Sequence, residues 1–368
     1  MKIFRIIFMI SLVMFVSVLY ATEKPSTTVY GYLKFDALYE NGNSSHGNFA
    51  IWASDSKGNG GLFHATANQT RLGFKFKGVS FGDFKVTGQL EIDFYGGGAE
   101  NKAHNYMRHA FLKISNGSLS ILAGQYWDII NPLNPFTLNY PVLWGAGNMG
   151  YRRAQLSFRK DFKSEKSIIS VQGGVFRNIA SDYDGDGVKD GVASGTPMVQ
   201  GRLSGKFLFG EKASLQLGLS GHYSKSKGVN RYNSNSMNVD FLLVLSPNVK
   251  IVAEYFSGKN LGVFLGGIAQ SVNTVDGIEV KAKGFYVNLQ FKLSKKTTFG
   301  IGYGMDNPYD DTLAVGDRAK NTSIFGNLLF KLSPSFKIGF EVSNFATEYK
   351  GLKEQKTMRI QNSWILSF

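Results

Sequence analysis

Residues 28–40 read TVYGYLKFDALYE, and apolar and polar side chains alternate along the whole stretch. Val29, Leu33 and Phe35 fall on one face of an extended chain, whereas Lys34 and Asp36 fall on the other. A period of two predicts a β-strand with one apolar face. The pattern returns in residues 68–78 and 84–94, so it describes more than one strand.

The same alternation continues along the rest of the chain. It recurs in residues 105–115, 118–126, 151–162, 167–177, 196–209, 213–224, 235–246, 249–257, 283–293, 296–305, 319–332, 336–345 and 355–368. We therefore expect about sixteen strands, each bounded to within about 2–4 residues. The least regular segment is 105–115, because Arg108 shares its parity with the apolar Leu112 and Ile114.

The composition supports an all-β chain with an unusual surface. Its 368 residues include 43 glycines, 30 phenylalanines and 17 tyrosines, and only 18% are charged, against about 25% in ordinary soluble domains. The absence of cysteine excludes disulfide scaffolds, thiolate metal sites and cysteine nucleophiles. Basic residues outnumber acidic ones by 41 to 27. No motif for nucleic-acid binding accompanies this positive charge.

The N-terminus predicts a secretory signal peptide. Lys2 and Arg5 precede an apolar run at residues 6–20, and Ala21 follows it. This order of a basic, an apolar and a small-residue region is typical of a cleaved signal. A membrane anchor is the alternative, but it needs about 20 apolar residues. We assign residues 1–21 to the signal peptide and 22–368 to one domain.

A transmembrane β-barrel explains the alternation. Strands of a barrel carry about ten residues of alternating polarity, and a sheet in lipid must close because its edge groups cannot be hydrated there. A periplasmic sandwich or β-helix also alternates, but about sixteen strands would need more than one sandwich, and no linker divides them. The fold class we expect is all-β, a closed transmembrane antiparallel β-barrel.

Short and long connections also alternate. Residues 116–117, 247–248 and 294–295 are short joints, whereas residues 41–67, 178–195 and 258–282 are long and rich in glycine and asparagine. This is the layout of outer-membrane barrels, with short periplasmic turns and long extracellular loops. A barrel of about sixteen strands is wide enough for a water-filled lumen.

The connection at 127–150, WDIINPLNPFTLNYPVLWGAGNMG, carries many large apolar side chains, so it should pack against other parts of the protein. Here the sequence resembles the trimeric porins, whose third loop folds into the lumen and narrows it. The segments AGQYW at 123–127, RAQL at 153–156 and PMVQGRL at 197–203 resemble the DcaP-like branch of these porins. The final strand ends at Phe368, which resembles the assembly signal of Gram-negative outer-membrane barrels. This resemblance implies the outer membrane of a Gram-negative-type bacterium as the location.

The resemblance implies a homotrimeric channel for small hydrophilic solutes, with a constriction loop between strands 5 and 6. A lid packed on the outer rim is the alternative position for that loop. The alternation of faces places charged side chains on the inner side of the strands. The connection at 127–150 adds one carboxylate. The predicted pore-lining residues are Lys34, Arg71, Glu91, Asp93, Asp128, Arg153 and Arg202.

Mid-strand arginines in this set predict a preference for anions, because rings of positive charge favour them. The DcaP-like resemblance also implies small anionic solutes, such as carboxylates or phosphates, beside neutral ones. The alternative is that these arginines pair with Glu91 and Asp93 and leave an almost unselective pore.

One loop predicts a calcium site. The sequence DYDGDGVKDG begins at Asp182 and spaces its carboxylates as a calcium loop does, with a glycine at the sixth position. The candidate ligands are Asp182, Asp184, Asp186, the Val188 carbonyl and Asp190. The bidentate glutamate of an EF-hand is missing, and the flanks read as strands, so the loop is closer to those of thrombospondin type 3 repeats. An acidic surface turn is the alternative.

Two other functions remain open at this stage. A monomeric, substrate-specific channel has the same strand pattern as a trimeric porin. An outer-membrane barrel enzyme is the second alternative, but the five histidines show no spacing typical of a triad or a metal pair. We therefore expect a non-enzymatic channel that requires no cofactor, embedded in the lipid bilayer.

Overall fold

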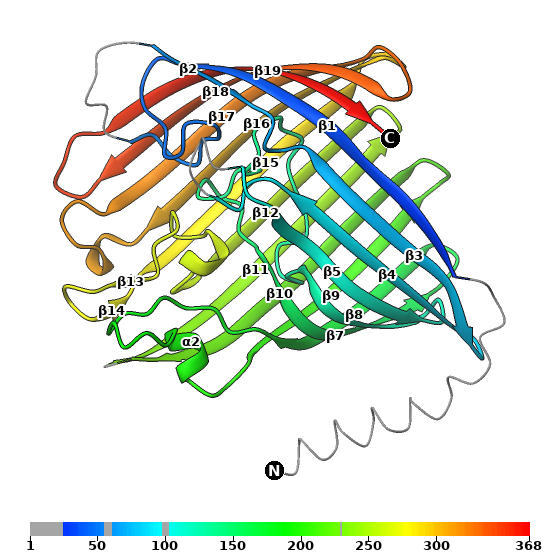
Figure 1. Ribbon diagram of the computed structural model, residues 1–368, viewed down its shortest axis with the longest axis horizontal. Coiled ribbons are helices and arrows are strands. Elements are labelled where there is room, and N and C mark those ends of the chain that lie inside the picture. The colour runs from blue at the N-terminus through cyan, green and yellow to red at the C-terminus, as the bar shows by residue number, and fades with distance from the viewer. Residues whose placement is uncertain (1–24, 55–60, 98–102, 229) are drawn as a thin grey trace.

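The computed structural model describes residues 25–54, 61–97, 103–228 and 230–368. The expected signal peptide at 1–21 lies outside these residues. Over the described part, the strands form one large antiparallel sheet whose first and last strands pair with each other. Figure 1 shows the strands wrapped side by side into a barrel.

The strands follow the order expected from the alternating pattern. The sheet contains β1 (Ser26–Glu40), β2 (Leu62–Thr66), β3 (Arg71–Phe81), β4 (Phe84–Asp93), β5 (Tyr106–Ser115), β6 (Leu119–Trp127), β7 (Arg152–Lys163), β8 (Ser167–Phe176), β9 (Met198–Phe209), β10 (Ala213–Lys227), β11 (Arg231–Ser246), β12 (Val249–Lys259), β15 (Lys281–Lys292), β16 (Thr297–Pro308), β17 (Arg318–Lys331), β18 (Phe336–Tyr349) and β19 (Gln355–Ser367).

These strands occupy sixteen positions around the barrel, because β2 and β3 share one. β2 pairs with the end of β1, and β3 pairs with its beginning, so the two are one wall strand interrupted at residues 67–70. The prediction of a closed transmembrane β-barrel of about sixteen strands is confirmed.

The barrel closes where β1 meets β19. Their register runs from Tyr32 opposite Ser367 to Glu40 opposite Arg359. In Figure 1 the first strand, in blue, lies beside the last, in red. This pairing satisfies the backbone groups of both strands, which would otherwise be open edges in a medium without water.

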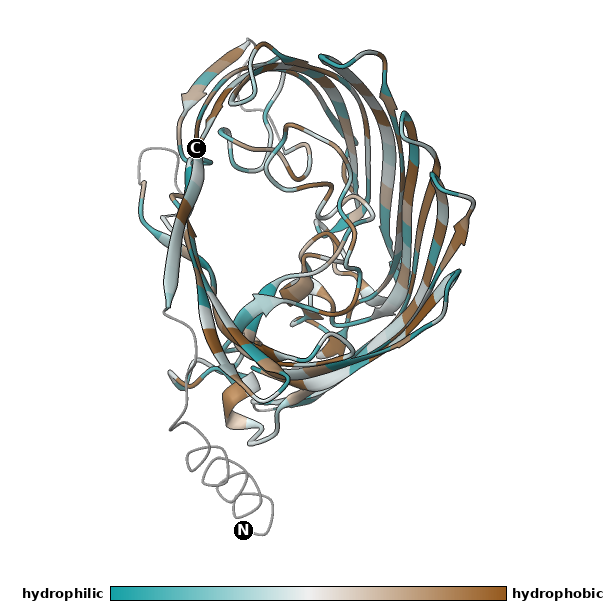
Figure 2. Cartoon of the chain, turned by 90° about the vertical axis from the view of Figure 1, so that its right-hand side faces the viewer, coloured by the Kyte–Doolittle hydropathy of each residue, from teal (hydrophilic) through white to brown (hydrophobic). Residues whose placement is uncertain are grey.

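Neighbouring residues of one strand face opposite environments. On β1, Leu33 is 55% exposed and points outward, whereas Lys34 is 4% exposed and points into the barrel. Figure 2 shows the same change of hydropathy from residue to residue along the strands. Apolar side chains therefore form the outer surface, and polar side chains line the lumen, as a barrel in lipid requires.

A β-bulge explains the irregular segment around Arg108. Glu91 of β4 lies opposite His109 of β5, and the next residue, Ile92, lies opposite Met107. Arg108 is thus an extra residue between two regular pairs, and a bulge of this kind can redirect a side chain. Its guanidinium is buried in the lumen, although its parity in the sequence matches the outward Leu112.

Where the structure describes them, the long connections contain only small regular elements. They hold α2 (Asp190–Ala193), the 3-10 turns η1 (Gly262–Phe264) and η2 (Asp310–Thr312), and a hairpin of β13 (Val272–Asn273) and β14 (Ile278–Glu279). Among the described residues, no helix has both the length and the hydropathy needed to cross a bilayer. The opposite end of the barrel carries the short turns, such as residues 247–248 between β11 and β12.

A charge on the outer face should destabilise this barrel far more than a charge in the lumen. We expect Leu219→Arg, at an outward position of β10 that is 52% exposed, to lower the free energy of unfolding in lipid vesicles by about 2–4 kcal/mol. Gln216 of the same strand points into a cavity of the lumen, so Gln216→Arg should change the free energy of unfolding little. Urea titration of both variants measures the difference, and equal losses would contradict the assigned faces.

Candidate functional site

The connection between β6 and β7, residues 128–151, is the inner loop. Its two ends are bonded to each other: the Asp128 amide donates to the Tyr151 carbonyl at 2.9 Å, and the Tyr151 amide donates to the Asp128 carboxylate at 3.0 Å. These bonds form a narrow base from which the rest of the loop extends. Figure 2 shows segments of the chain lying inside the ring of strands.

The far part of the inner loop is fixed to the opposite wall. The Leu133 amide donates to Glu254 on β12 at 2.7 Å, and the Leu138 amide donates to Glu341 on β18 at 2.6 Å. Both acceptors lie on the inner face near the middle of their strands. The loop therefore crosses the lumen, which excludes the alternative position as a lid on the outer rim.

Two further segments fold inward and pack against this loop. Asn139 exchanges hydrogen bonds with the backbone of Ala50, and the Gly150 amide donates to the Phe264 carbonyl at 2.8 Å. Residues 41–54 and 260–271 thus occupy part of the lumen. A buried apolar cluster joins loops and wall: Ile130, Met149, Phe176, Met198, Phe256, Leu261, Phe264 and Ala282. Sequence reasoning missed both segments, although Ile51, Leu261 and Phe264 are apolar residues in polar loops.

Lys34 serves to hold the inner loop. Its ammonium donates to the Leu138 carbonyl at 2.9 Å and lies 3.3 Å from Asp36. The side chain is almost fully buried. Lys34 therefore faces inward as predicted, but its charge is compensated and covered by the loop.

Arg71, Glu91 and Asp93 meet at one cluster, together with Arg108. The Arg108 guanidinium donates to Glu91 at 2.8 Å and to Asp93 at 2.6 Å, while Arg71 lies 3.5 Å from Glu91. The predicted set of pore-lining residues did not include Arg108, because its position in the alternating pattern matches that of outward-facing residues such as Leu112. The cluster faces a cavity of about 280 Å³, whose other lining residues include Trp127 and Tyr140.

Asp128 and Arg153 form a buried pair at the base of the inner loop. Arg153 Nε lies 2.8 Å from Asp128 Oδ1, and Arg153 is 1% exposed. Gln200 donates to the same carboxylate at 2.6 Å. Burial raises the pKa of Asp128, and the guanidinium opposes that rise. These two predicted pore-lining residues are therefore covered, and they fix the loop rather than present charge to the lumen.

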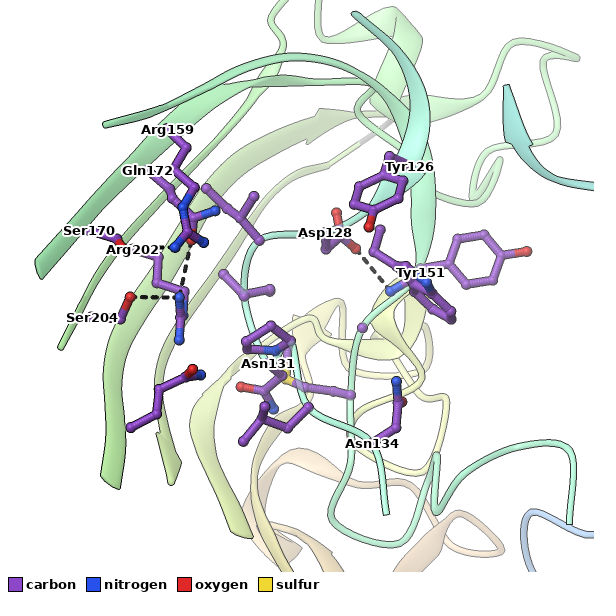
Figure 3. A pocket seen from close by; sticks show the side chains of 18 of the residues that line it. Tyr126, Asp128, Asn131, Asn134, Tyr151, Arg159, Ser170, Gln172, Arg202 and Ser204 are labelled. Carbon is purple, nitrogen blue, oxygen red and sulfur yellow. Dashed lines mark hydrogen bonds between the residues drawn. The ribbon is translucent and has the colours of Figure 1, made fainter. Parts of the chain in front are cut away.

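Arg202 is paired but still borders open space. Its guanidinium makes two hydrogen bonds to Asp240, at 2.7 and 3.0 Å. It also lines a cavity of about 310 Å³ between the wall and the inner loop. Figure 3 shows Arg159, Gln172 and Arg202 on one side of this cavity and Asp128 on the other.

Unpaired positive charge is concentrated in the half of the barrel nearest the short turns. The charge comes from lysines whose strand register places them on the inner face. For example, Lys113 lies opposite Thr87, Lys206 opposite the cavity-lining Gln216, and Lys250 opposite Gln290. We call this set the mouth lysines: Lys75, Lys77, Lys85, Lys113, Lys206, Lys250, Lys292, Lys331 and Lys337.

None of the mouth lysines forms an ion pair with a described residue. Asp161 shares their half of the barrel, but it is bonded to Arg159 at 2.7 Å. The carboxylates farther along the strands hold arginines or loop amides, as Asp240 and Glu341 do. Over the part of the chain that the structure describes, this end of the lumen therefore carries lysines without ion-pair partners, although Asp83, Glu165 and Glu211 lie in the short turns at the same end.

The Asp-rich loop lies between β8 and β9, at the end of the barrel that carries the long connections. Asp182, Asp184 and Asp190 each have a carboxylate oxygen within 4.8 Å of the others. Asp186 is exposed and is not part of this group, and the Val188 side chain is also exposed. The structure brings together three of the four predicted carboxylates.

No family model and no curated protein matches this sequence. Solved structures do match it. The outer membrane channel DcaP of Acinetobacter baumannii superposes with a TM-score of 0.74 at 19% identity, covering 94% of this chain and 97% of that one. The anion-selective porin from Comamonas acidovorans gives 0.61 at 12% identity, covering 94% and 100%. OmpT of Vibrio cholerae, in its trimer form, gives 0.55 at 12% identity, covering 94% and 99%.

The chain has the fold of the Gram-negative outer-membrane porins. The expected likeness to the DcaP-like porins is confirmed at the level of the fold. Closure, strand number and the alternation of short and long connections all agree with this porin fold.

The buried pair at the base of the inner loop gives a testable prediction. Asp128→Asn leaves Arg153 charged and buried without a counter-ion, and removing one partner of such a pair costs about 3–5 kcal/mol. We expect the double variant Asp128→Asn/Arg153→Met to recover part of this loss, because no unpaired charge remains. Unfolding free energies of the porin-type barrel measure both effects, and equal losses in the single and double variants would contradict the pairing.

Proposed function

We propose that this protein is a passive diffusion channel of the outer membrane, a homotrimer that admits small hydrophilic solutes and prefers anions. The observation that carries this proposal is the set of mouth lysines, which face the lumen without ion pairs to described residues. It is supported by the porin fold and by the two cavities beside the inner loop.

The inner loop and the lysines act in different ways. The loop takes up part of the cross-section, because its backbone is bonded to β12 and β18 across the lumen, so only small solutes pass. The lysines set a positive potential at the mouth, which raises the local concentration of anions. This potential reaches about 10 Å at 0.1 M salt and about 3 Å at 1 M.

The solutes that fit this arrangement are small anions and small neutral polar molecules. The channel needs no cofactor, because diffusion through a wet lumen requires no chemical step. Two names among the similar structures agree with the proposal: one is called anion-selective, and one is described in a trimer form. The enzyme alternative has little support: His222 is buried against Phe264 and bonded to Ser234 and Ser236 of the same wall.

The ion preference can be measured as a reversal potential in a salt gradient. We expect the wild-type channel to be more permeable to chloride than to potassium. In Lys113→Glu/Lys206→Glu the chloride-to-potassium permeability ratio should move toward one, because two mouth lysines become acids. Lys225→Glu/Lys227→Glu makes the same change of charge at exposed, outward positions at the far end of β10 and should leave the permeability ratio unchanged. A cation preference in the wild type would contradict the proposal.

The oligomeric state separates the trimer from a monomeric channel. We expect native mass spectrometry of the detergent-solubilised protein to give the mass of three chains, and chemical crosslinking to stop at three. A single-chain mass under mild detergent conditions would contradict the trimer and support a monomeric, substrate-specific channel.

A further inference from the structure

The Asp-rich loop between β8 and β9 holds a cluster of carboxylates that the transport function does not use. Asp182, Asp184 and Asp190 direct oxygens to within 4.8 Å of one another. Three anions this close repel each other strongly in the absence of a cation. The cluster lies at the end of the barrel that carries the long connections, which is the extracellular end in outer-membrane barrels, and the mouth lysines lie at the opposite end.

Asp190 supplies an independent reason to expect a ligand. Its side chain is fully buried, and neither of its carboxylate oxygens has a hydrogen-bond partner among the described residues. A buried carboxylate without a donor is costly unless a proton or a cation compensates it.

The backbone of the loop places these carboxylates. The amides of Gly185 and Gly187 donate to the two oxygens of Asp182, at 2.8 and 3.1 Å. Both glycines have positive φ, at 73° and 86°, which glycine adopts without strain. The chain therefore wraps around the cluster instead of extending away from it.

We propose that Asp182, Asp184 and Asp190 bind one calcium ion, with the Val188 carbonyl as a further ligand. Calcium takes six to eight oxygen ligands in flexible geometry, which suits carboxylates spread along one loop. Magnesium demands a compact octahedron and keeps its waters. Because the loop lacks a bidentate glutamate, we expect a dissociation constant of about 10⁻⁴–10⁻³ M, as in extracellular modules.

The ion would fasten one extracellular connection to another. Gly228, which follows β10, lies against the cluster: a methyl group there would be 2.7 Å from Asp190 Oδ2 and 3.1 Å from Asp184 Oδ2. Asn178, before the loop, donates to the Lys225 carbonyl of β10 at 2.6 Å. Binding at Asp190 thus secures the loop to the outer end of β10, and transport through the lumen does not depend on it.

The test uses the full-length protein in a neutral detergent after removal of metals with a chelator. We expect calorimetric titration with calcium chloride to show one site per chain, and Asp190→Asn and Asp184→Asn each to weaken it at least ten-fold. Asp276→Asn, in the connection between β12 and β15, removes the same charge from another loop and should leave the affinity unchanged. Tyr183, between two of the ligands, should sensitise terbium luminescence that excess calcium abolishes.

Heat-modifiable migration on gels shows that each variant is a folded barrel. Tyr183→Phe should lose the terbium signal and keep the calcium heat, because it removes the sensitiser and no ligand. Absence of calcium binding to the wild type at millimolar concentrations would overturn the proposal. So would equal affinity in the wild type, Asp184→Asn and Asp190→Asn, since the ion would then lie elsewhere.

Discussion

The pairing of β1 with β19 is the contact on which the rest of the structure depends. The hydrocarbon core of a bilayer offers no partner for a backbone amide or carbonyl, so the sheet is stable there only when it has no edge. Closure fixes an inside and an outside, and the alternation of each strand then sorts its side chains between lipid and water. On β1, Phe35 goes to the lipid and Asp36 to the lumen for this reason alone.

The same requirement for partners explains the acids in the lumen. An inward loop brings backbone amides into a space where strands already satisfy one another, so the wall must supply acceptors. Glu254 and Glu341 of the wall accept from Leu133 and Leu138, and Asp128, at the base of the loop itself, accepts from Tyr151. Carboxylates that would otherwise face the pore are therefore used to hold the loop, while lysines near the short turns have no such role.

Side-chain periodicity was enough to predict the barrel. Residues 167–177 and 213–224 were expected as strands, and the structure has Ser167–Phe176 and Ala213–Lys227. The alternation of faces gave the wrong side for Arg108. A β-bulge there changes the face to which the side chain points, and the alternating pattern does not reveal a bulge. The ion pairs could not be predicted either: Asp128 reaches Arg153 only because the inner loop closes at Tyr151. Segments 41–54 and 260–271 lie within the connections 41–67 and 258–282, which the sequence predicts only as long polar loops, since their few apolar residues show no period.

The charges of the lumen are distributed unevenly along its axis. Near the middle, guanidinium and carboxylate groups cancel in pairs, as in Arg202 with Asp240, whereas the end with the short turns keeps the ammonium groups of the mouth lysines. Fixed charge at one end of an ion path enriches counter-ions there and not at the other end. If the proposed channel conducts ions, we expect it to rectify: equal voltages of opposite sign would drive unequal currents, and the orientation of the barrel in the membrane would set the favoured direction.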